Sequence, residues 1–267
     1  MTVHKDDSGR RWVQAEVEVP GTPEEVWQAI ATGPGISSWF VPTELEGREG
    51  GAIAASFGPG MDSASTISTW DPPRRFVADS QDMGPEAPTI ATEWIVEARS
   101  GGTCVVRVVH SWFASSDDWD GQFEAFEHGW PAFFRILRLY LTHFRGQPCS
   151  AFQLMGAAPE PTAGAWDALT GSLGLAEAAV GKRVETADGA PPLGGLVEGM
   201  GPREYPELLL RVDEPTAGIA HLFALPMGGQ VFLPLRLYLY GDRAPAAVAR
   251  DEPVWQAWMN EHFPIGQ

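Results

Sequence analysis

The sequence contains very little lysine and no long apolar run. Of its 267 residues only Lys5 and Lys182 are lysines, and 18 basic residues stand against 35 acidic ones, for a net charge of −17. Nucleic-acid backbones and anionic lipids both need lysine or arginine for binding, so this balance excludes them as partners. No segment reaches the ~20 apolar residues of a membrane span. We therefore expect no nucleic-acid binding and no membrane insertion.

Cysteine is equally scarce. Cys104 and Cys149 are the only two, and their separation fits neither a metal site nor a disulfide framework. Cys104 falls in a strand pattern and is expected to be a small buried hydrophobe. No apolar run of the signal-peptide kind follows Arg10 and Arg11, so the expected location is cytoplasmic.

The common catalytic and cofactor motifs are also missing. The sequence has no His-Glu-x-x-His, no Gly-x-Ser-x-Gly and no paired-cysteine motif. Gly58-Pro59-Gly60 is a tight turn, because no Lys-Ser/Thr pair and no helix follow it. These absences leave hydrolase, metalloenzyme and nucleotide-binding functions without support, and we expect no cofactor and no metal.

One acidic segment approaches a calcium-binding loop without completing it. Counting from Ser116, residues Asp118, Asp120, Gly121 and Glu127 take loop positions three, five, six and twelve. Serine occupies the first position, however, and a strand instead of a helix comes before it. Acidic residues are also favourable at any helix N-terminus through the helix dipole. We interpret the segment as the acidic start of a helix.

What the sequence does contain is an internal repeat. Val26–Gly33 (VWQAIATG) resembles Ala165–Gly171 (AWDALTG), and Ser68–Arg75 (STWDPPRR) resembles Val197–Glu204 (VEGMGPRE). Both segments of the first match read as a helix after a strand, and both segments of the second match read as a strand that runs into a Pro-Arg turn. Two matches in the same order predict one fold used twice.

The first half begins with a strand and two helices. Apolar and polar residues alternate over Trp12–Val19, which predicts a half-buried strand. Thr22 then provides an N-cap, Pro23 a first helical turn and Glu25 a capping box. We expect this helix to stop at Gly33 and a short second helix to cover Ile36–Phe40.

Strands and one long helix complete the first half. Strand patterns separated by glycine, proline or aspartate cover Val41–Glu46, Ala52–Phe57, Ser65–Trp70, Arg75–Ser80, Thr89–Ala98 and Thr103–Phe113. From Asp117 to Phe144 the apolar residues recur at steps of three and four, which predicts an amphipathic helix that Pro131 kinks. The order predicts an α+β helix-grip fold, an antiparallel sheet curled round a long C-terminal helix, over residues 11–146.

The second half repeats this order with losses, ending in a shorter helix over Val248–Phe263. Its strand candidates are Ser150–Met155, Val180–Glu185, Leu193–Glu198, Glu207–Val212, Ala217–Leu225 and Val231–Tyr240, with a helix at Gly164–Gly171. We predict a helix-grip domain at residues 1–146 and a degenerate second copy at residues 147–267. The alternative is that residues 147–267 merely cover the first domain with irregular strands.

Four segments of the first half resemble a known family. They are Ile36–Pro42 (ISSWFVP), Trp70–Arg75 (WDPPRR), the strand from Gly102 to Ser111, and Glu127–Trp130 (EHGW). Together they resemble the START-like (SRPBCC) superfamily of polyketide cyclases, dehydrases and lipid-transport proteins, and within it relatives of the C-terminal domain of the Hsp90 ATPase activator.

The resemblance implies a deep, mostly apolar cavity that the superfamily uses for binding, transport, cyclisation or partner regulation. The second half lacks the Trp-Phe-x-Pro and Gly-Trp motifs. Its own cavity is therefore expected to be collapsed, with a structural or interface role.

His110 is the candidate for chemistry. Alternation along Thr103–Phe113 places Cys104, Val106, Val108, His110 and Trp112 on the inner face of the sheet if Arg107 faces solvent. A histidine on a cavity wall could protonate or orient a carbonyl group. The alternative, which we favour, is a structural histidine that bonds a neighbouring helix or turn, since no nucleophile accompanies it.

The aromatic residues are the candidate ligand contacts, although any single one could equally be plain core. The expected ligand-binding set is Trp39, Phe40, Phe57, Trp94, His110, Trp112, Phe126, Trp130 and Phe133. The sequence thus favours a non-catalytic protein that binds a small hydrophobic molecule. A polyketide aromatase/cyclase that uses His110 is one alternative. A partner-regulating module, with a protein partner or a homodimer, is the other.

Overall fold

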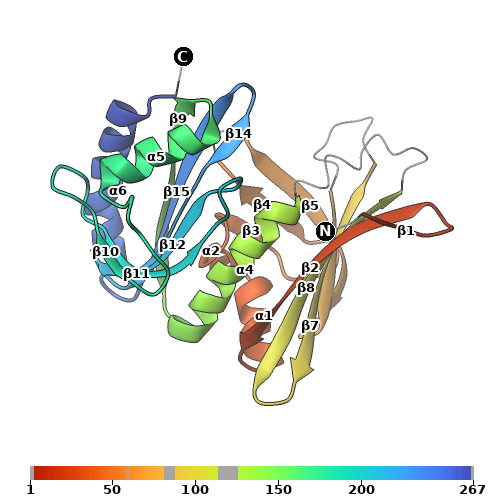
Figure 1. Cartoon of the computed structure of the whole chain (residues 1–267). Coiled ribbons are helices and arrows are strands. Elements are labelled where there is room, and N and C mark those ends of the chain that lie inside the picture. Colours follow the sequence, from red (N-terminus) through yellow and green to blue (C-terminus); the bar gives the residue numbers. More distant parts are fainter. Residues whose placement is uncertain (1–2, 59, 81–87, 114–125, 266–267) are drawn as a thin grey trace. The chain divides into compact units, whose positions relative to one another are not determined.

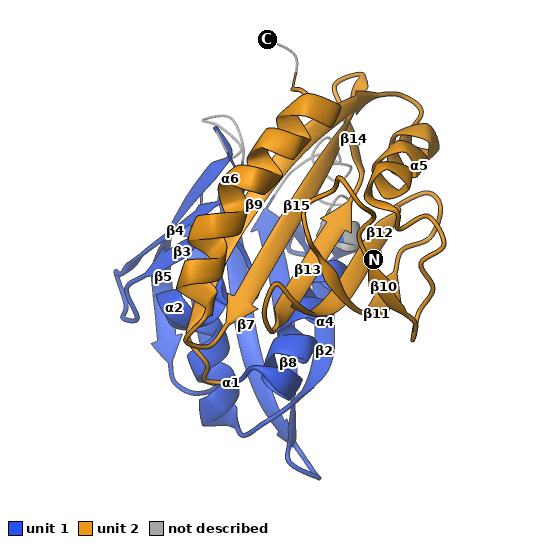
Figure 2. Ribbon diagram, turned by 90° about the vertical axis from the view of Figure 1, so that its left-hand side faces the viewer, with its two compact units in different colours: residues 1–145 blue, residues 146–267 orange. Residues whose placement is uncertain are grey.

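The computed structural model describes residues 3–58, 60–80, 88–113 and 126–265, except for the side chains of residues 126–128. The chain divides into two compact units, Met1–Arg145 and Gly146–Gln267, shown in different colours in Figure 2. Each unit contains one antiparallel sheet and a long C-terminal helix. The predicted α+β class is therefore confirmed.

The first unit is built on a sheet of eight strands in the order β1-β2-β8-β7-β6-β5-β4-β3. The first strand of the fold, β2, pairs along its whole length with the last one, β8, which brings the two ends of the unit together. Its elements are β1 (His4–Lys5), β2 (Arg10–Pro20), α1 (Pro23–Ile30), α2 (Gly33–Ser37), β3 (Thr43–Leu45), β4 (Ala52–Ser56), β5 (Asp62–Asp71), β6 (Arg75–Ser80), β7 (Ile90–Arg99), β8 (Thr103–Phe113) and α4 (Phe126–His143).

The start of α1 is the predicted capping box. The Thr22 hydroxyl accepts a hydrogen bond from the Glu25 backbone N–H at 3.3 Å, and the Glu25 carboxylate accepts one from the Thr22 N–H at 2.8 Å. The same carboxylate pairs with Arg145 at 2.7 Å, just beyond the end of α4. One side chain thus connects the beginning of α1 to the end of the unit.

The predicted second helix over Ile36–Phe40 is wrong in its position. The helix α2 begins at Gly33, because the Thr32 hydroxyl caps the Gly35 N–H at 3.1 Å and Pro34 suits a first turn. A side chain on Gly35 would meet the carbonyl oxygen of Gln28 at 1.9 Å, so only glycine fits there. Trp39 and Phe40 consequently follow the helix instead of belonging to it.

The long helix α4 carries the apolar face that the sequence predicts. Its buried side chains are Trp130, Phe133, Phe134, Ile136, Leu137, Tyr140 and Leu141. Pro131 lies inside the helix, near its described N-terminal end. The rest of the predicted helix start and the calcium-like segment at residues 116–121 lie outside the described residues.

The second unit follows the same path with fewer strands. Its sheet runs β10-β11-β12-β13-β15-β14, and the first strand, β9, pairs with β15 as β2 does with β8. Its elements are β9 (Cys149–Pro159), α5 (Thr162–Leu173), β10 (Arg183–Glu185), β11 (Gly194–Met200), β12 (Glu207–Glu214), β13 (Gly218–Phe223), β14 (Leu225–Met227), β15 (Gln230–Tyr240) and α6 (Ala244–His262), as labelled in Figure 1. The helix α6 begins four residues before the predicted one, and β14 was not predicted.

The two repeats in the sequence occupy matching places in this topology. In the first unit they fall on α1 and on the end of β5, and in the second on α5 and on the end of β11. Counted outward from the pairs β2–β8 and β9–β15, β5 and β11 hold the same place in their sheets. The prediction of one fold used in tandem is confirmed at this level, and the alternative of irregular covering strands does not hold.

The inner face of the second sheet is packed with aliphatic side chains. Alternate residues of β15, namely Val231, Leu233, Leu235, Leu237 and Leu239, are all buried in one cluster. Trp255, Trp258 and Met259 of α6 and Leu169 of α5 pack into the same cluster. Among the described residues, no helix of either unit is long and apolar enough to cross a membrane.

We predict that Thr22→Ala lowers the free energy of unfolding by about 1 kcal/mol, because the Glu25 N–H loses its capping acceptor. Urea unfolding followed by circular dichroism measures the change. The control is Thr142→Ala, since the Thr142 hydroxyl only bonds the Arg138 carbonyl within its own helix and is exposed. Equal stability of the two variants would contradict a structural role for the cap.

Candidate functional site

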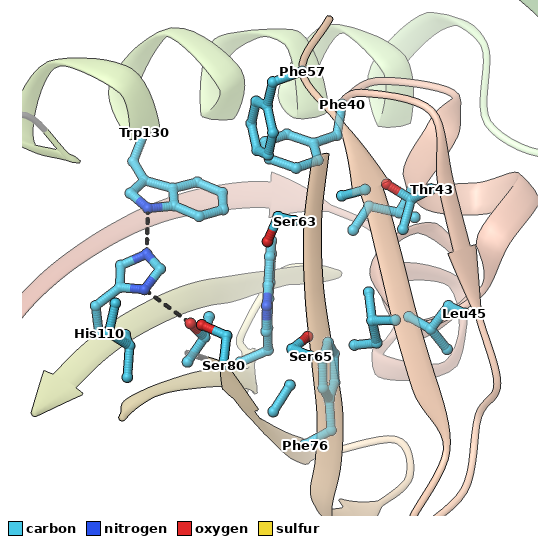
Figure 3. Close-up of a pocket in the computed structure, with 17 residues that line it drawn as sticks. Phe40, Thr43, Leu45, Phe57, Ser63, Ser65, Phe76, Ser80, His110 and Trp130 are labelled. Atoms are coloured by element: carbon cyan, nitrogen blue, oxygen red, sulfur yellow. Dashed lines mark hydrogen bonds between the residues drawn. The ribbon is translucent and has the colours of Figure 1, made fainter. Parts of the chain in front are cut away.

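The first unit contains a cavity of about 280 Å³ against the inner face of its sheet (Figure 3). This volume lies near the lower end of the range for small-molecule sites, roughly 300–1,000 Å³. Seventeen residues from α2, the strands β3 to β8, the connections near them and α4 line it. They are Ile36, Phe40, Thr43, Leu45, Ile53, Ala55, Phe57, Ser63, Ser65, Phe76, Ala78, Ser80, Ile90, Thr92, Trp94, His110 and Trp130.

Strand register explains why these residues meet. Directly opposite residues on neighbouring antiparallel strands present their side chains on the same face of the sheet, about 5 Å apart. Four rows of such residues cross the cavity floor. One row is Leu45, Ile53, Ser65, Ser80 and Ile90; the second is Ala78, Thr92 and His110; the third is Phe76 with Trp94; the fourth is Thr43, Ala55 and Ser63.

Aromatic rings form the wall opposite the floor. The rings of Phe40 and Trp130 are nearly parallel, with centroids 5.6 Å apart, and Phe57 meets Phe40 edge-on at the same distance. Trp94 rises from β7 and meets the Trp130 ring edge-on at 5.2 Å. Figure 3 shows Phe40, Phe57 and Trp130 on the helix side and Ser63, Ser65 and Ser80 on the strand side. The cavity therefore has an aromatic half and a half with hydroxyl groups.

His110 joins the two halves through both of its ring nitrogens. The indole N–H of Trp130 donates to His110 Nε2 at 2.7 Å, and His110 Nδ1 lies 2.9 Å from the hydroxyl oxygen of Thr92. An indole N–H can only donate, so Nε2 must accept and the ring proton of a neutral imidazole resides on Nδ1. His110 therefore donates to Thr92. Dashed lines in Figure 3 mark the hydrogen bonds of the His110 ring.

Burial keeps His110 uncharged. The side chain is 6 % exposed, and burial lowers the pKa of its imidazole from 6.5 to about 4. Desolvation disfavours the charged form, and no carboxylate is among the lining residues to compensate. At neutral pH all seventeen lining side chains are consequently uncharged. The described residues also contain no cluster of histidine, cysteine, aspartate and glutamate suited to a metal ion.

The structure brings five of the nine expected ligand contacts to the cavity: Phe40, Phe57, Trp94, His110 and Trp130. Trp39 does not line it but supports the wall, with its indole N–H bonded to the Ala29 carbonyl and its ring against Trp94. Phe133 packs against the Phe40 ring at 4.3 Å in a similar supporting position. Trp112 is buried on β8 beyond His110 and does not line the cavity. The side chain of Phe126 lies outside the described residues.

Sequence reasoning missed the small and hydroxyl-bearing half of the cavity. Ser63, Ser65, Ser80 and Thr92 line it, and none of them was among the expected contacts. A usable signal was present, since Phe76, Ala78 and Ser80 alternate along β6 just as Thr92 and Trp94 do along β7. Serine and threonine at inward positions of a strand mark a face that is not sealed by core packing.

The comparison with protein families finds a match within the first unit. Residues 20–142 match the family model described as activator of Hsp90 ATPase homolog 1-like protein. A search among curated protein sequences finds no significant match.

Several solved structures are similar to the chain at low identity. The di-domain ARO/CYC BexL from the BE-7585A biosynthetic pathway aligns with 96% of this chain and 100% of its own, at 14% identity and a TM-score of 0.45. DynU16, from the dynemicin biosynthetic locus, aligns over 93% of both chains at 16% identity and a TM-score of 0.43. The Aha1 dimer from Colwellia psychrerythraea aligns with 51% of this chain and 98% of its own, at 18% identity and a TM-score of 0.41. Residues 20–142, most of the first unit, are thus similar to the activator of Hsp90 ATPase homolog 1-like family.

Proposed function

We propose that the first unit binds a small, uncharged, largely apolar molecule in the cavity between its sheet and α4, without catalysing a reaction on it. The observation that carries the proposal is the composition of the cavity wall. Five aromatic rings and several aliphatic side chains supply apolar contact area, and every lining group is uncharged at neutral pH. Such a site favours a neutral ligand, because a buried charge would find no countercharge there.

The hydrogen bonding of His110 supports a binding role over a catalytic one. A general acid or base needs a free ring nitrogen within reach of the substrate and a pKa near the working pH. Both nitrogens of His110 already have partners in the protein, and burial lowers its pKa to about 4. The aromatase/cyclase and the partner-regulating module stay as alternatives, and no feature of the cavity favours either of them.

Native mass spectrometry tests the proposal on the protein as purified. We expect a bound mass below about 300 Da that is lost on denaturation, because the cavity volume limits the ligand to this order of size. A bare protein that also fails to bind small neutral aromatic molecules in titration calorimetry would overturn the proposal.

Blocking the cavity should abolish binding. Ala55 lines the cavity, whereas the adjacent Ala54 on β4 is exposed on the other face of the sheet. We predict that Ala55→Phe weakens the binding of indane, a neutral bicyclic hydrocarbon, at least tenfold, since the new ring takes up the ligand's space. Ala54→Phe makes the same chemical change outside the cavity and should bind indane like the wild type. Titration calorimetry measures the affinity of each variant for indane. If the two variants bind indane equally tightly, the ligand does not occupy this cavity.

The buried neutral His110 predicts a specific pH dependence of stability. The unfolded chain takes up a proton on this histidine below pH 6.5, but the folded protein does so only below about pH 4. The unfolded state binds more protons in this window, so the free energy of unfolding must fall as the pH falls. The shift corresponds to about 2 kcal/mol of lost stability at pH 5 relative to pH 7.5.

The measurement compares urea unfolding of the wild type and of His110→Gln between pH 7.5 and pH 5. The difference in stability between the two proteins should shrink by about 2 kcal/mol as the pH falls, because the variant lacks this titration. If the free energies of unfolding of the two proteins change in parallel between pH 7.5 and pH 5, His110 has the same pKa in the folded and unfolded states.

A further inference from the structure

The Trp130–His110–Thr92 chain of hydrogen bonds has a fixed direction. It begins at a donor-only indole N–H on α4, passes through the neutral imidazole and ends at a hydroxyl on β7. The direction cannot reverse while Trp130 holds Nε2, since Nδ1 then carries the only ring proton. Trp130 on α4 thus determines whether the last group, the Thr92 hydroxyl, can act as a hydrogen-bond donor toward the cavity.

The last group is the hydroxyl of Thr92. Its oxygen accepts the His110 Nδ1–H at 2.9 Å, so its own proton must point away from the imidazole. Within the described part of the chain this hydroxyl has no other hydrogen-bond partner. Thr92 is half-buried and lines the cavity beside Ala78, the residue opposite it on β6. The Trp130–His110–Thr92 series of hydrogen bonds therefore presents a donor to the cavity interior.

Donation through such a chain is stronger than donation by an isolated hydroxyl. An oxygen that accepts one hydrogen bond becomes a better donor, and the effect is larger in surroundings of low dielectric. A donor in an apolar cavity also costs free energy when it is left without an acceptor. A ligand that brings an acceptor atom to Thr92 should therefore bind more tightly than an apolar ligand of the same shape.

The surroundings restrict the acceptor to an uncharged one. A carboxylate or phosphate would need a cation, and none of the lining residues supplies one, because His110 is neutral there. A carbonyl oxygen satisfies the donor without introducing charge, and the rest of such a molecule can lie against the aromatic wall.

We propose that Thr92 is the specificity-determining residue of the cavity, and that its hydroxyl donates to the carbonyl oxygen of a small neutral ketone, aldehyde or ester. The proposal rests on the ligand-binding function proposed above. It assigns Trp130 and His110 as positioning residues that fix the direction of the Thr92 hydroxyl. Ser63, Ser65 and Ser80 are not held by this chain, so the preference is assigned to Thr92 alone.

The test compares 1-indanone with indane, which share a bicyclic skeleton and differ in one carbonyl group. Titration calorimetry with the full chain should show the ketone binding about tenfold tighter after correction for the different hydration of the two ligands. Thr92→Val removes the hydroxyl at nearly constant shape and should bring the affinity ratio close to one. Thr92→Ser restores a hydroxyl and should restore the preference.

Two further variants test whether the direction of the hydrogen bonds, and not merely a threonine-to-valine change in the sheet, causes the preference for the ketone. Thr66 is exposed on the outer face of β5, so Thr66→Val is a matched control that should keep the wild-type ratio. Trp130→Phe removes the indole N–H, lets the histidine proton move to Nε2 and allows the Thr92 hydroxyl to donate to Nδ1 instead. This variant should lose much of the preference for the ketone although Thr92 is still present.

Infrared spectroscopy gives a readout that a structural role for Thr92 would not affect. The carbonyl stretch of bound 1-indanone should lie at lower frequency in the wild type than in Thr92→Val. If the valine variant does not fold, two comparisons remain. The carbonyl stretch of 1-indanone bound to the wild type should lie at lower frequency than that of the ketone in hexane, and the serine variant should show the same lowering.

The outcomes distinguish the two proposals. Equal binding of both ligands by the wild type, or an unshifted carbonyl stretch, would overturn the role of Thr92 and leave the ligand-binding function standing. Binding of neither ligand would overturn both. A preference for the ketone that persists in Thr92→Val would transfer the donor role to another lining group.

Discussion

The hydrogen bond from Trp130 to His110 is the interaction on which the cavity of the first unit depends. It connects the long helix α4 to the last strand β8 across the inner face of the sheet, and both partners are buried. It also fixes the tautomer of the histidine, the direction of the bond to Thr92 and the position of the large indole ring. Trp130 belongs to the aromatic wall and Thr92 to the hydroxyl-bearing floor, so the two hydrogen bonds of His110 join the two sides of the cavity.

The two units show that one topology serves two different interiors. In the first unit the inward positions of β5 to β8 include Ser65, Ser80, Thr92 and His110, which cannot pack against one another as aliphatic side chains do. In the second unit the inward positions of β15 are valine and leucine throughout, and α6 fills the remaining space with Trp255, Trp258 and Met259. Close packing of aliphatic side chains fills the interior of the second unit, whereas the first unit retains a cavity beside its inward serine, threonine and histidine side chains.

Much of the local structure could be predicted because its causes lie within a few residues. The capping box of Thr22 and Glu25, the alternation in β8 and the apolar face of α4 all follow from the spacing of residue types. The second helix was misplaced because Gly33 was interpreted as the stop of the first helix, whereas it is the first residue of α2 and Pro34 lies in the first turn. Its actual position depends on the approach of Gly35 to the Gln28 carbonyl, which is a contact between two elements.

The sequence by itself determined the α+β class, the tandem order of elements and the aromatic character of the interior, because periodicity and composition are local properties. It also singled out His110, but not Trp130 and Thr92 as its hydrogen-bond partners. Only the tertiary structure decided that Phe40, Phe57, Trp94 and Trp130 face a cavity while Trp39, Phe133 and Trp112 do not. The distinction arises from strand register and from the position of α4, which bring together residues that lie far apart in the chain. The direction of the bond from His110 to Thr92 has the same origin, since it is set by Trp130, which lies on a helix 38 residues further along the sequence than Thr92.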